Sequence, residues 1–128
     1  MTDTFPAPLV AFVDTFNRGA FWESHEVLEP AWRAGRSTFY HGLILLASAH
    51  VHGEHANRHG VEAQCAKALP RLTPFRPVWL GLDVDALVRH LDTCRSRAAA
   101  AGRWPGLPAL TLTLDARRLR GTEPELAG

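Results

Sequence analysis

Apolar residues recur every three or four positions along most of the chain, which is the spacing of one helix face. The first run follows Pro8, which is tolerated in a first helical turn, and it ends at Gly19, which can adopt a positive φ. Pro30 interrupts the second run and should kink it. Ser37 and Asp83 carry side chains typical of helix N-caps. The pattern therefore predicts five helices, over residues 8–17, 20–34, 38–57, 61–69 and 84–101.

The pattern changes after Gly102, where two prolines break regular structure. Residues 110–114 then alternate between leucine and threonine, which predicts one short strand. We therefore expect an all-α fold: an antiparallel bundle of about five helices in residues 1–102, followed by an extended C-terminal tail in residues 103–128. A lone strand leaves backbone groups unpaired, so it must pack along its own bundle or pair with a second copy. Because three aromatic residues (Phe75, Trp79 and Trp104) add apolar surface, we expect a homodimer.

Composition indicates a globular chain with no strongly charged partner. Of the 128 residues, 46% are apolar and 21% are charged, and the formal net charge of +1 gives no reason to expect nucleic acid or a membrane. The chain shows no signal-peptide pattern, and its longest apolar stretch, residues 43–49, is too short to cross a bilayer. Cys65 and Cys94 form no CxxC pair, so we expect reduced core thiols in a cytoplasmic protein.

The second helix carries the first candidate chemistry. At 100° per residue, His25, Glu29 and Trp32 fall within about 60° of one another, with Trp22 beside them and Glu26 at the edge. A histidine and a glutamate four residues apart can hydrogen-bond each other or reach one metal ion. A carboxylate among aromatic rings is desolvated unless it is paired. Three interpretations stay open: a structural hydrogen-bonded pair, a metal or small-ligand site, and a plain surface pair.

The third helix has a polar line on an otherwise apolar surface. Its members are His41, Ser48, His52, His55 and His59. The last two have the spacing of a two-histidine metal clamp, but they lie at a polar helix end where exposure is expected. His50 points the other way. We expect His52 and His41 to face His25 and Glu29 across the helix interface, because buried polar groups need partners.

The segment from Phe16 to Trp32 resembles the signature of a bacterial and archaeal family called domain of unknown function 309. That family has a His-x-x-x-Glu-x-x-Trp/Tyr motif, which His25, Glu29 and Trp32 match here. Later blocks are also similar: Gly42-Leu43-Ile44, His52, Asn57, Gly60 and Gly81-Leu82-Asp83. The resemblance covers about residues 7–98 and implies an all-α fold with a metal bound by the motif. The chain departs where relatives often have glutamine. Leu45 weakens such a site, whereas His41 could supply a replacement ligand.

The leading hypothesis is a helical protein that binds a divalent metal ion of unidentified type, or a small ligand. Its assigned residues are His25 and Glu29 as ligands, His52 and His41 as further ligands, and Trp22 and Trp32 as pocket or packing residues. Whether the protein is an enzyme stays open. Metal-assisted hydrolysis would be the natural reaction class, with Glu26 taking the proton from metal-bound water. The alternative is a non-catalytic oligomeric interaction protein in which the motif is a structural polar network.

Overall fold

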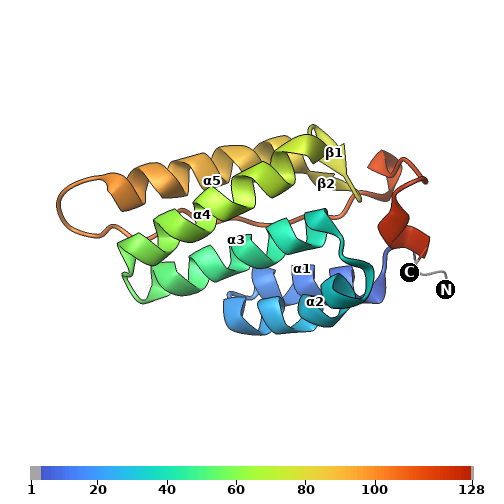
Figure 1. The fold of residues 1–128 in the computed structure, drawn as a ribbon, viewed down its shortest axis with the longest axis horizontal. Coiled ribbons are helices and arrows are strands. Elements are labelled where there is room, and N and C mark those ends of the chain that lie inside the picture. Colours follow the sequence, from blue (N-terminus) through green and yellow to red (C-terminus); the bar gives the residue numbers. More distant parts are fainter. Residues whose placement is uncertain (1–3, 128) are drawn as a thin grey trace.

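The computed structural model describes residues 4–127, and these form a bundle of five helices with a tail that runs back along it (Figure 1). The all-α prediction is therefore confirmed. The helices are α1 (Ala7–Asn17), α2 (Phe21–Gly35), α3 (Thr38–Glu54), α4 (Arg58–Leu72) and α5 (Val84–Ala99), with 3-10 turns η1 (Thr73–Phe75), η2 (Ala116–Arg118) and η3 (Pro124–Ala127). Each helix packs against the next in sequence, and successive helices run antiparallel (Figure 1).

Side-chain caps explain where three of the helices begin. Ser37, Asn57 and Asp83 each accept a hydrogen bond of 3.0 Å from the backbone N–H three residues further on. Two of these caps were predicted from the sequence. The third, Asn57, explains why α4 begins three residues earlier than predicted, and α4 also continues through Pro70. In the same way α2 continues through Pro30 as one helix.

The core is centred on α3, which packs against both α2 and α4. Phe39, Leu43 and Leu46 on α3 are fully buried, as are Phe12 on α1 and Leu91 on α5. The first half of α3 is apolar on nearly every side, and this is why it can be buried among the other helices. A membrane-spanning helix would need more length and apolarity than any helix within residues 4–127 offers.

A small hairpin, which the sequence did not predict, joins α4 to α5. Its strands β1 (Val78–Trp79) and β2 (Leu82–Asp83) are antiparallel. The turn residues Leu80 and Gly81 both have positive φ, 51° and 74°, as a two-residue hairpin turn of the primed type requires. Leucine rarely adopts this conformation, so the turn carries no ordinary sequence signal. Glu123 supports it, because its buried carboxylate accepts a 3.2 Å hydrogen bond from the Leu80 N–H.

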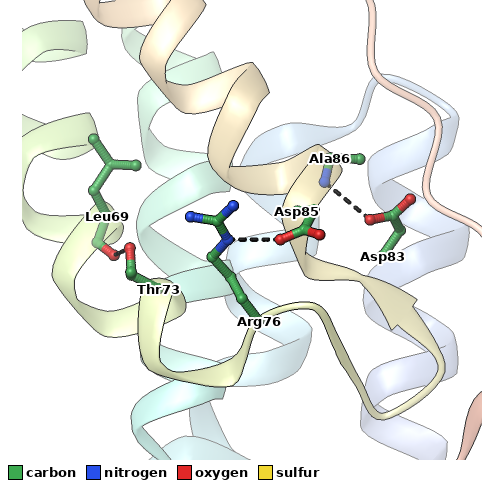
Figure 2. A network of polar contacts seen from close by, with 6 residues as sticks. All are labelled: Leu69, Thr73, Arg76, Asp83, Asp85 and Ala86. Carbon is green, nitrogen blue, oxygen red and sulfur yellow. Dashed lines mark hydrogen bonds and ion pairs between the residues drawn. The ribbon is translucent and has the colours of Figure 1, made fainter.

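Polar contacts hold the start of α5 against the segment that follows α4 (Figure 2). Arg76 Nε donates to the Asp85 carboxylate at 2.6 Å, close to the cap formed by Asp83. Where α4 passes into η1, the Thr73 hydroxyl donates to the Leu69 carbonyl at 2.6 Å. Of these contacts, the ion pair between Arg76 and Asp85 joins the segment after α4 to the start of α5.

The tail is extended as predicted, but the strand predicted over residues 110–114 is wrong. These residues pair with no strand within the part of the chain that the structure describes. The side chain of Asn17 satisfies the backbone instead: it accepts from the Leu112 N–H and donates to the Leu112 carbonyl, both at 2.8 Å. A second contact ties the tail to the end of α3, where Trp104 Nε1 donates to the Gly53 carbonyl at 3.1 Å. The tail thus packs on its own bundle at these points, and the homodimer stays a prediction.

Candidate metal centre

Three side chains of metal-ligating type meet in the core between α3 and α5. His50 comes from α3, while His90 and Cys94 lie four residues apart on α5. Their exposed fractions are 5%, 8% and 0%. The nearest ligand atoms of the three all lie within 4.8 Å of one another. Within residues 4–127, no other group of three histidine, cysteine, aspartate or glutamate side chains comes together in this way.

The contacts inside this His50–His90–Cys94 cluster converge on one atom, Nε2 of His90. It lies 2.9 Å from Nε2 of His50 and 3.4 Å from Sγ of Cys94. The two imidazole planes are within 5° of parallel, and their centroids are 5.1 Å apart. Rings stacked face to face could not bring two nitrogens to 2.9 Å without overlap. The rings therefore meet edge to edge, with the two nitrogens facing each other.

Hydrogen bonding alone cannot satisfy both contacts of His90 fully. A neutral imidazole nitrogen carries either one hydrogen or one lone pair. If Nε2 of His90 accepts from His50, its lone pair is taken and the Cys94 thiol must compete for it. If it donates, one hydrogen is shared between a nitrogen and a sulfur. A metal ion in place of that hydrogen would accept a lone pair from all three atoms at once.

Burial at His50 and polar contacts at Cys94 favour the protonation states that metal binding needs. Burial, and then the neighbouring His90, lower the pKa of His50 to about 4, so the ring is neutral near pH 7. Hydrogen bonding with Cys65, a second buried thiol on α4, is the largest influence lowering the pKa of Cys94, and His90 lowers it further against the effect of burial. The same contact and burial raise the pKa of Cys65. Cys94 is therefore the thiol that loses its proton first. Both cysteines are free and buried, as the sequence predicted.

Aromatic side chains enclose the cluster on the side of α1 and α2. The ring of His50 lies 5.2 Å from that of Phe16 and 4.6 Å from that of Phe21, measured between centroids. A cavity of about 390 Å³ reaches these rings and His50, with Leu107 of the tail on its other side. His50 is thus the member of the cluster that lies nearest to a route from solvent.

The motif predicted on α2 forms a separate, more exposed group. Nε2 of His25 lies 3.7 Å from the Glu29 carboxylate, and Arg33 approaches the same carboxylate at 3.5 Å. Nδ1 of His25 is buried and has no hydrogen-bond partner among the described residues. Trp22 is 57% exposed and places its ring centroid 5.4 Å from that of His25. Glu26 is exposed. The structure thus brings the histidine and the carboxylate of the motif together.

His41 and His52 on α3 have other partners. His41 stacks on Trp32 with ring centroids 4.3 Å apart, and its Nδ1 accepts a 3.0 Å hydrogen bond from Arg71 Nε. Nδ1 of His52 lies 3.1 Å from the side-chain amide of Asn57. Across residues 4–127, neither histidine completes a three-ligand group with the pair on α2. The ligand set drawn from the motif therefore stays a prediction.

The residues that do cluster carry little signal in the sequence. His50 lies on the side of α3 away from the polar line, and Cys94 was expected to be a reduced core thiol. One local signal was present, since His90 and Cys94 have the same four-residue spacing as His25 and Glu29. His50 and His90 are 40 residues apart in the sequence, so the pattern within a single helix could not predict their contact.

The fold and the cluster define a small all-α protein with a buried histidine–cysteine site. Residues 9–63 match the family model described as Domain of unknown function (DUF309), which confirms the resemblance seen in the sequence over this segment. The match contains the motif on α2 and His50, but it ends before His90 and Cys94. Comparison with curated proteins and with solved structures finds no match. Because the family description states no activity, function must be argued from the site.

Proposed function

We propose that this protein binds one transition-metal ion, such as zinc, through Nε2 of His50, Nε2 of His90 and Sγ of Cys94. The main support is the convergence of these three atoms within 4.8 Å in the core. Imidazole and thiolate ligands favour zinc and related soft or borderline ions over magnesium and calcium, which prefer oxygen. The identity of the ligands therefore sets the class of metal.

The observed distances are close to those of a tetrahedral site. With zinc bonds of about 2.0 Å to nitrogen and 2.3 Å to sulfur, tetrahedral angles separate two nitrogens by about 3.3 Å and a nitrogen from a sulfur by about 3.5 Å. The separation of His90 Nε2 from Cys94 Sγ is 3.4 Å already. The two histidine nitrogens, 2.9 Å apart, would have to move apart by about 0.4 Å and turn toward the sulfur. Because the two nitrogens face each other, both imidazole rings would have to turn toward the sulfur for their lone pairs to meet at one ion.

The fourth ligand position decides what the ion does. If Cys65 filled it, the site would be a closed Cys₂His₂ centre of the structural kind, whereas a water molecule there would leave an open, catalytic type of site. Cys65 is fully buried on α4 and close enough to Cys94 to shift the pKa of that thiol. We therefore favour the closed site, in which the metal joins α3, α4 and α5 and stabilises the fold. The exposed Glu26 on α2 has no part in such a centre.

Metal stoichiometry tests the proposal directly. Reduced protein is loaded with Zn²⁺, desalted and measured by native mass spectrometry and elemental analysis. We expect one ion per chain in the wild type and in the control His55→Ala, because His55 is exposed. Cys94→Ser and His90→Ala should lose the ion, provided that circular dichroism shows both variants to be folded. Loading with Co²⁺ should give a thiolate-to-metal charge-transfer band that Cys94→Ser lacks.

Two results would contradict the proposal. One is a folded, reduced wild type that retains well under one equivalent of Zn²⁺. The other is an ion that survives Cys94→Ser and His90→Ala alike. In either case the cluster would be a hydrogen-bonded network that serves only the core.

The motif on α2 is a second candidate site, supported by the buried, unpartnered Nδ1 of His25 and by its approach to Glu29. The same stoichiometry experiment with His25→Ala separates the two sites. Loss of the ion in His25→Ala but not in His90→Ala would assign it to α2. Metal-assisted hydrolysis with Glu26 as the base would become testable only in that case.

A further inference from the structure

A second cavity, independent of the metal centre, is lined by residues of the tail's η3 and of the start of α3. Its volume is about 610 Å³. The walls are largely apolar and come from the start of α1, the end of α2, η1, β1 and η3. Two aromatic rings, those of Phe75 and Trp79, lie 5.0 Å apart between centroids and form one wall. A cavity of this size and composition is typical of small-molecule sites.

One carboxylate, that of Glu125, supplies charge to this cavity. It accepts a 2.7 Å hydrogen bond from the Ser37 hydroxyl and two longer ones, 3.2 and 3.3 Å, from Trp79 Nε1. Both donors are neutral, and the structure gives Glu125 no ion pair within residues 4–127. The nearby Arg120 lies over the Trp79 ring at 5.4 Å from its centroid. Glu125 is therefore the one charged side chain among the described residues of the wall, which is otherwise neutral and largely apolar.

The wall contains a second polar group that the protein leaves unused. Tyr40 is 4% exposed, and its hydroxyl is buried without a hydrogen-bond partner among the described residues. Burial, and then the charge of Glu125, raise the pKa of Tyr40, so the hydroxyl stays protonated and lies within electrostatic reach of the carboxylate. A role for Glu125 in holding η3 onto α3 would explain the contact with Ser37. It would not explain an unpaired hydroxyl, because such groups are costly to bury.

We propose that this cavity binds a small organic ammonium ion with an apolar body. The ammonium group would donate hydrogen bonds to the Glu125 carboxylate and to the Tyr40 hydroxyl oxygen, while the apolar body packs on Phe75 and Trp79. An anionic ligand would be repelled by Glu125. A neutral apolar ligand would leave the carboxylate desolvated and the hydroxyl unpaired. A cationic donor can hydrogen-bond both groups and also compensates the charge of the carboxylate, which a neutral donor cannot do.

The test compares three probes of similar shape on the full chain: 2-phenylethylammonium, 2-phenylethanol and 3-phenylpropanoate. Binding is followed by NMR through the indole N–H signal of Trp79, which is assigned from its absence in Trp79→Phe. We expect saturable binding of the ammonium probe, at least about tenfold tighter than binding of the alcohol, because only the cation forms a charge-assisted hydrogen bond. The carboxylate probe should not bind.

Two variants and a control complete the test. Glu125→Gln should weaken binding of the ammonium probe until its affinity equals that of the alcohol. Tyr40→Phe should weaken binding of the ammonium probe several-fold. Glu62→Gln, which changes an exposed glutamate on α4, should leave it unchanged. The proposal is overturned if wild-type protein shows no saturable shift, if the alcohol or the carboxylate probe binds as well as the amine, or if Glu125→Gln binds normally. Since the probe comparison uses wild-type protein, it holds even where a variant fails to fold.

Discussion

Leu112→Ala tests whether the tail is part of the core. Leu112 is 4% exposed within the main apolar cluster, and both its backbone groups are hydrogen-bonded to Asn17 at 2.8 Å. Truncating a buried leucine to alanine costs about 2–5 kcal/mol, because apolar contacts are lost and a cavity remains. Leu112 sits on a tail that can shift to fill part of that space. We therefore expect a loss in the lower half of this range, about 2–3 kcal/mol.

Urea denaturation at several protein concentrations measures this loss. The controls are Thr111→Ala and Thr113→Ala, which change exposed neighbours and should cost less than about 0.5 kcal/mol. A loss below about 1 kcal/mol for Leu112→Ala would refute the packing of the tail on its own bundle. A stability that rises with protein concentration, together with a dimer in light scattering, would support the predicted homodimer, and loss of both in Leu112→Ala would assign the interface to the tail.

Two further predictions concern the fold. Gly42→Ala should destabilise the protein by about 1 kcal/mol in thermal unfolding, because a Cβ there would lie 2.5 Å from Leu72 Cδ2 and overpacking of about 1–3 kcal/mol exceeds the gain in helix propensity. Gly35→Ala, which meets open space, should be neutral or stabilising, and equal effects at both glycines would contradict the argument. Burial opposes ionisation of Glu123, but backbone N–H groups, among them that of Leu80, lower its pKa below the ordinary value of 4.5. The ionised form therefore stabilises the fold above about pH 4.5, and this stabilisation is lost as the pH falls further. Glu123→Gln should make the melting temperature depend less on pH below about pH 4.5, and an unchanged pH dependence would contradict this prediction.

The parts of the fold that depend on local chemistry were predictable from the sequence. Apolar spacing gave all five helices, and the caps at Ser37 and Asp83 gave two of their starts. The hairpin was not predictable, because Leu80 adopts a positive φ that leucine disfavours. Its conformation is supported by Glu123, which lies 43 residues away in the tail. A prediction made from neighbouring residues alone cannot take account of such a contact.

The predicted strand failed for a related reason. Alternation of leucine and threonine indicates that one side of a segment is buried, and Leu112 is indeed buried while its threonine neighbours are exposed. Alternation does not identify what satisfies the backbone. Here a single side chain, Asn17, bonds both backbone groups of Leu112 in place of a neighbouring strand. Half of the inference, the burial pattern, therefore held without the sheet it usually accompanies.

The candidate metal centre shows which kind of sequence signal deserved more weight. The polar line on α3 and the motif on α2 drew attention because polar residues gathered on one face, yet such a face can remain partly exposed, as His25 and Glu29 do. His90 and Cys94 instead follow Leu87 at offsets of three and seven, which places them on the apolar face of α5. A histidine on an apolar face must find a partner in the core, because burial without one is costly. The partner had to come from another buried face, and His50 was the histidine of α3 that lay away from the polar line.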